Sequence, residues 1–230
     1  MDTRFNSSVT DIFRNEYLSP RSPYTTLQIP KQGIGEWCHP LHTVDINDAG
    51  LRSSVQNGIL NTELGIPFRT PAEGHNVAFT SLWDNYPDSL EIPLKGKASR
   101  AYLLMAGSTN HMQCHIDNGV IRVYYKDGTC DVMFLRNPDN WPPIEHIFFE
   151  DGLAFNRHTP ALYRLRLKTG EISNNFGEEL GFPGASRELD GGAAVLLEMP
   201  LNPGKKLSHL VLETLSNDAV IGLMSITLQR

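Results

Sequence analysis

The side chains of this sequence that are best suited to ligand binding lie in two places. The run WDNY, from Trp83 to Tyr86, puts two aromatic rings beside a carboxylate, Asp84, and an amide, Asn85, and Trp141 lies further along in a long irregular segment. An aromatic ring can stack on the C–H face of a sugar while Asp and Asn bind its hydroxyls. These five residues therefore predict a ligand-binding groove for a glycan. A structural interpretation stays equally open for WDNY, with Trp83 in the core and Asp84-Asn85 capping a turn.

Four carboxylates could instead support hydrolysis, because a carboxyl group beside aromatic rings can have a raised pKa and act as a general acid. They are Asp84, Glu145, Glu150 and Asp151. A glycoside hydrolase needs two carboxylates that flank one bond, at a separation that the sequence does not give. No GxSxG, Walker or Rossmann motif is present. The sequence favours loop charges that face water, hence no catalytic residue, with a glycoside hydrolase as the alternative.

Two short segments have metal-ligand residue types. The run STNHMQCHIDNG contains His111, Cys114 and His115, whose types suit zinc. Cys114 and His115 would point to opposite faces of an extended strand, and no second cluster is evident, so an ordinary loop is favoured. The run DIND resembles part of a calcium loop but lacks the glycine and distal glutamate of an EF-hand. Its residues Asp45, Asn47 and Asp48 are weak candidates for a structural calcium ion, and no other cofactor is expected.

Composition limits the class of protein. The chain has 230 residues, of which 40% are hydrophobic and 20% charged, so it can bury a real core. A net charge of −6 and no basic cluster argue against nucleic-acid binding. No apolar run approaches the roughly 20 residues of a membrane-spanning helix, and the first residues contain no signal-peptide core. Three cysteines, an odd number, allow at most one disulfide.

The elements that must position these residues are mostly strands. β-branched, aromatic and leucine-rich runs bounded by Gly, Asn, Asp or Pro predict nine of them. They are Asn76–Ser81, Ser89–Leu94, Ser99–Ala106, Val120–Lys126, Thr129–Leu135, Leu162–Lys168, Ala193–Met199, Leu207–Leu215 and Val220–Leu228. Asp127-Gly128 predicts a hairpin, since this pair suits a type I′ turn, and residues 216–218 predict a second hairpin. The pattern indicates an all-β protein with an antiparallel β-sandwich, and it predicts the jelly-roll arrangement of that sandwich.

The N-terminal part differs in kind. Val9, Ile12, Phe13 and Tyr17 have helical spacing and predict a short amphipathic helix. Residues 19–40 combine four prolines with apolar side chains, which predicts an extended arm that packs on a domain surface. The predicted organisation is therefore a helix and extended arm, or interdomain linker, over residues 1–40 and a β-sandwich domain over 41–230.

Several runs resemble an uncharacterised bacterial domain that is associated with glycoside hydrolases and is similar to galactose-binding-like jelly rolls. They are SPRSPYTTLQIP, QGIGEWCHP, GIPF, SLWDNYPDSLEIPLKGKA, AYLLMAGSTN and NPDNWPPIE. The resemblance covers nearly the whole chain from about Ser19. It departs at Trp141-Pro142-Pro143, where the family pattern has a Trp-Trp-Pro run, so part of any aromatic platform is missing here.

The resemblance implies a non-catalytic carbohydrate-associated module of a polysaccharide-degrading system. Its partner would be a glycan or a neighbouring glycoside-hydrolase domain that it braces, and it would carry no catalytic residues. A periplasmic or extracellular location is expected if the chain belongs to a larger exported protein. The competing expectations are a glycoside hydrolase and a purely structural domain.

Overall fold

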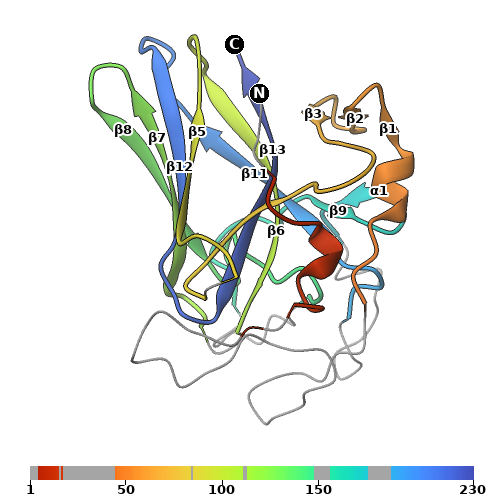
Figure 1. Cartoon of the computed structure of the whole chain (residues 1–230). Coiled ribbons are helices and arrows are strands. Elements are labelled where there is room, and N and C mark those ends of the chain that lie inside the picture. Colours follow the sequence, from red (N-terminus) through yellow and green to blue (C-terminus); the bar gives the residue numbers. More distant parts are fainter. Residues whose placement is uncertain are drawn as a thin grey trace.

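The structure is a computed structural model, and it describes residues 5–15, 17, 45–83, 85–110, 113–147, 156–175 and 188–230. The predicted all-β sandwich is confirmed (Figure 1). Two helical turns, η1 (Val9–Asp11) and α1 (Ala49–Ser53), accompany the strands. The strands are β1 (Val55–Gln56), β2 (Ile59–Asn61), β3 (Pro67–Arg69), β4 (Ala78–Ser81), β5 (Ser89–Pro93), β6 (Arg100–Thr109), β7 (Asp117–Tyr125), β8 (Cys130–Arg136), β9 (Arg164–Arg166), β10 (Ile172–Ser173), β11 (Ala193–Pro200), β12 (Leu207–Thr214) and β13 (Ala219–Gln229).

The sandwich consists of a six-stranded sheet, in the order β10-β9-β11-β6-β13-β4, and a four-stranded sheet, in the order β5-β12-β7-β8. All their strand pairs are antiparallel. From β4 to β7 the chain alternates between the two sheets, and it does so again from β11 to β13. This alternation is compatible with the predicted jelly roll, whereas the galactose-binding-like assignment stays a prediction. A third, small sheet has the order β1-β2-β3.

The nine predicted strands all correspond to strands of the sandwich, and one turn forms differently from the prediction. β7 and β8 form the expected hairpin, but of its two central residues only Gly128 has a positive φ, 85°. A type I′ turn needs a positive φ at both, so the hairpin does not contain that turn. The second predicted hairpin is wrong, because β12 and β13, on either side of residues 216–218, belong to different sheets.

Strand β6 is buried on both faces, which explains its continuously apolar sequence. Leu103 and Met105 pack between the two sheets. Leu104 and Ala106 point the other way, into a second core on the outer face of the six-stranded sheet. This second core includes the N-terminal residues Val9, Ile12 and Tyr17.

The N-terminal residues that the structure describes pack on the sandwich, but not as the predicted helix. Among the N-terminal residues that the structure describes, only η1 is helical, yet Val9 and Ile12 are fully buried. Asn6 anchors the segment on β4, where its side chain donates to Phe79 O (2.9 Å) and accepts from Phe79 N (2.8 Å). The predicted extended arm, residues 19–40, lies outside the described residues.

Candidate functional site

The WDNY rings lie in the second core. Trp83 and Tyr86 are buried, and the Trp83 indole Nε1 donates a hydrogen bond to Asn217 O at 2.6 Å. The ring of Tyr17 meets that of Trp83 edge-on, with centroids 6.1 Å apart. Burial raises the pKa of the Tyr86 hydroxyl, which lies 3.2 Å from Ser7 Oγ. For these two rings the structural interpretation is favoured, because neither exposes a face on which a sugar could stack.

Trp141 is also part of the core, at 0% exposure between the two sheets. Its ring packs so closely on Gly107 that a Cβ there would come within 2.7 Å of Trp141 Cζ2. Asn85 is exposed, and Asp84 lies outside the described residues. Burial of all three rings of the predicted groove argues against their stacking on a ligand.

Of the four carboxylates proposed for catalysis, the structure describes only Glu145, because Asp84, Glu150 and Asp151 fall outside the described residues. Glu145 is buried and accepts a hydrogen bond from Ser108 Oγ at 2.9 Å. Burial raises the pKa of this carboxyl to about 7. Such a pKa suits a general acid, yet a fully buried carboxyl cannot reach a substrate bond without a rearrangement.

The weak calcium candidates have other partners. Asp45 pairs with Arg14, and Asn47 Oδ1 accepts from Ala49 N (3.0 Å) at the start of α1. Asp48 is buried, and its Oδ2 accepts from Arg52 Nε (2.9 Å) and Asn76 Nδ2 (2.7 Å). Asn47 and Asp48 therefore anchor α1, whereas Asp45 binds the N-terminal segment. These contacts do not resemble the shell of oxygen ligands that calcium requires.

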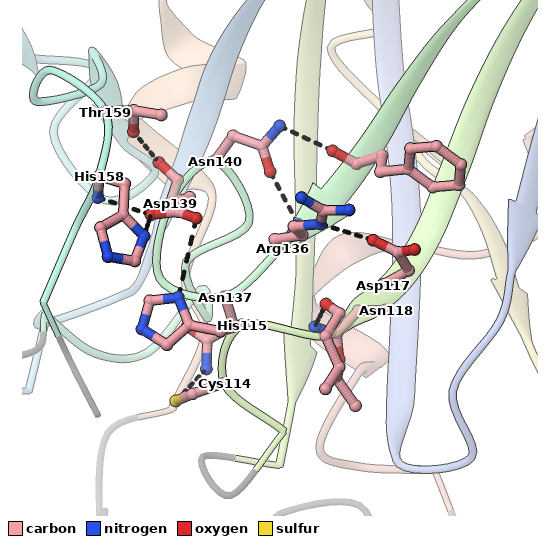
Figure 2. Close-up of polar contacts among 12 residues, drawn as sticks. Cys114, His115, Asp117, Asn118, Arg136, Asn137, Asp139, Asn140, His158 and Thr159 are labelled. Carbon is pink, nitrogen blue, oxygen red and sulfur yellow. Dashed lines mark hydrogen bonds and ion pairs between the residues drawn. The ribbon is translucent and has the colours of Figure 1, made fainter. Parts of the chain in front are cut away.

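A different set of metal-ligand residues comes together at one end of the sandwich (Figure 2). His115 lies between β6 and β7, Asp139 follows β8, and His158 precedes β9. One ligand atom from each lies within 4.8 Å of the other two. Of the predicted zinc candidates, only His115 belongs to this group; His111 lies outside the described residues, and Cys114 is not a member.

The backbone aims these three side chains at one another. His115 has a left-handed φ of 55°, and its N–H donates to Asn137 O at 2.7 Å, which joins its loop to the segment after β8. The His158 N–H donates to Asp139 Oδ1 at 2.7 Å, and Thr159 Oγ1 donates to Asp139 O at 2.6 Å. The three loops are thus tied together by hydrogen bonds that do not involve the imidazole rings.

A second feature is the outer face of the four-stranded sheet. On β7, β8 and β12 alternate residues fill the core, among them Ile121, Val123, Leu135, Leu210 and Leu212. The residues between them point outward. The strand registers place the outward residues in three rows, His209–Tyr124–Cys130, Val211–Arg122–Val132 and Glu213–Val120–Phe134. Val120, at the centre of the third row, is nevertheless 0% exposed.

This outer face presents stacking rings and polar groups side by side. Tyr124 and His209 are half-buried and stacked, with centroids 4.7 Å apart and an interplanar angle of 15°. Arg122 forms an ion pair with Glu213 one row away. Phe134 is 42% exposed, and the Arg136 guanidinium lies over its ring at 5.7 Å.

Sequence reasoning missed both features, for different reasons. Asp139 and His158 stand far apart in the chain from His115, so no local spacing joins them. The outer face could have been found, because the Asp127-Gly128 hairpin and the alternation along β7 and β8 together fix which side chains share a face.

No family model matches the chain, and neither the curated proteins nor the solved structures contain a match. Among the described residues, no helix is long and apolar enough to span a bilayer.

Proposed function

We propose that this chain is a non-catalytic, carbohydrate-associated module that holds a glycan against the outer face of the four-stranded sheet. The observation that carries the proposal is the combination of the stacked Tyr124–His209 pair, the exposed ring of Phe134 and the Arg122–Glu213 pair on one face of the sheet. Aromatic rings suit the C–H faces of sugars, and the ion pair offers both donors and acceptors to hydroxyls.

The dimensions of this surface agree with an oligosaccharide ligand. Neighbouring strands lie about 4.8 Å apart, and rows two residues apart along a strand are separated by about 7 Å. Three strands and three rows therefore make a surface of roughly 10 Å by 14 Å.

The role of Glu145 supports a module rather than a hydrolase. Its carboxyl is buried against Ser108 and close to the equally buried Arg164. Arg164 donates to His146 O (2.8 Å), Pro143 O (2.7 Å) and Ala193 O (3.0 Å), which fixes the segment around Glu145 on β11. The two charged groups are placed to hold a loop on the sheet.

Retention of the protein in gels that contain soluble polysaccharides tests the proposal. We expect Tyr124→Ala and Phe134→Ala to weaken retention several-fold to about tenfold each, since a stacking ring contributes about 0.5–1.5 kcal/mol beyond its burial. Tyr163→Ala is the matched control, because Tyr163 is an exposed aromatic residue outside this face. Equal retention of the wild type and the three variants would contradict a glycan site on this face.

The same polysaccharides separate the competing functions. Release of reducing sugars by the isolated chain would favour a glycoside hydrolase, whose carboxylates would come from Asp84, Glu145, Glu150 and Asp151. Neither retention nor release would favour a module that uses this face to brace a neighbouring hydrolase domain.

A further inference from the structure

We propose that His115, Asp139 and His158 form a binding site for a divalent transition-metal ion, with zinc as the ion that fits the donor set best. The inference is independent of the proposed glycan face, since the site lies in the loops at one end of the sandwich and shares no residue with the sheet surface (Figure 2).

The distances between the ligand atoms are long for direct hydrogen bonds and close to the separation of two ligands of one ion. His158 Nδ1 lies 3.5 Å from Asp139 Oδ1, and His115 Nδ1 lies 3.8 Å from Asp139 Oδ2. Both distances exceed the roughly 2.7–3.2 Å of an N–H···O hydrogen bond. Two ligands of a tetrahedral zinc ion, each about 2.0–2.1 Å from the metal, are separated by about 3.3 Å. Small side-chain rotations would thus bring all three atoms to the zinc.

The carboxylate of Asp139 is held in place for this role. It is only 14% exposed, and its Oδ1 accepts the His158 backbone N–H at 2.7 Å. Side chains that bind a metal are typically held in orientation by such hydrogen bonds. The imidazoles of His115 and His158 lie with centroids 4.7 Å apart and an interplanar angle of 42°, so both rings border the same space.

The donor types select the metal. Two imidazole nitrogens and one carboxylate suit zinc and its neighbours in the transition series, whereas calcium and magnesium prefer six or more oxygen ligands. Three protein ligands leave a coordination position for water or another oxygen ligand. The His158 side chain is 64% exposed, so solvent reaches one side of the proposed site.

Calorimetric titration of the metal-free full chain with Zn²⁺ tests the proposal. We expect binding of one ion to this site, with affinity reduced at least about tenfold by either His158→Ala or Asp139→Asn. Asp139→Asn keeps an oxygen that can accept the His158 N–H. His75→Ala is the control, because His75 is an exposed histidine outside the group. The zinc affinity of this variant should equal that of the wild type.

Cobalt and pH supply readouts that a structural role alone would not change. Co²⁺ in a tetrahedral N₂O site should give visible absorption bands in the wild type and the control but not in His158→Ala. Zinc affinity should be lower in acidic buffer, because metal binding to imidazole nitrogens competes with proton binding. Circular dichroism checks that the variants are folded. No zinc binding, or binding equal in all the variants, would overturn the proposal, as would cobalt bands that persist without His158.

Discussion

Replacing Trp141 by alanine should strongly destabilise the fold, because the side chain is a core residue and not an open platform. It is 0% exposed and packs between the sheets against the backbone of Gly107. Truncation of a buried Trp to Ala costs about 3–5 kcal/mol of the free energy of unfolding. For a domain of this size each kcal/mol lowers the Tm by about 2–4 °C, so a fall of roughly 6–20 °C is expected.

Trp141→Phe should cost less than Trp141→Ala. The phenyl ring keeps much of the buried apolar volume. Among the residues that the structure describes, the Trp141 Nε1 has no hydrogen-bond partner, so removing this N–H leaves no acceptor unsatisfied. The order of stabilities should therefore be wild type, then Trp141→Phe, then Trp141→Ala.

Urea denaturation followed by circular dichroism gives these free energies, and differential scanning fluorimetry gives the Tm. Phe134→Ala is the matched control, since its ring is 42% exposed on the outer face of the four-stranded sheet and its loss should change stability by about 0.5–1 kcal/mol at most. If Trp141→Ala were no less stable than Phe134→Ala, the assignment of Trp141 to the core would be refuted.

Two further predictions concern buried positions next to these sheets. Burial raises the pKa of the Glu145 carboxyl from 4.5 to about 7. Between pH 4.5 and about 7 the folded state therefore binds more protons than the unfolded state. The free energy of unfolding should fall by about 3 kcal/mol as the pH rises through this range. Glu145→Gln should remove this slope in urea titrations at several pH values, and an unchanged slope would assign it to other groups. Gly107→Ala should cost at least about 1–3 kcal/mol, because its Cβ would collide with Val220 O and the Trp141 ring; a Tm equal to that of the wild type would contradict the packing.

The sequence by itself determined the strands and their faces. Alternation of polar and apolar residues marks a half-buried strand such as β5, and a continuously apolar run marks a doubly buried strand such as β6, because side chains in a strand point to alternate faces. These local patterns are the reason that the nine predicted strands and the all-β class are confirmed. They also fixed the β7–β8 hairpin, although not its turn type.

The tertiary structure alone decided which sheet each strand joins and which side chains meet. The chain crosses between sheets at residues 216–218, where the sequence pattern predicted a hairpin, because turn residues do not encode which strand supplies the next hydrogen bonds. Whether Trp83 and Trp141 are open or buried likewise depends on what packs over them, and no local pattern records that. His115, Asp139 and His158 come from three separate loops, and only the packing of those loops at one end of the sandwich brings them together.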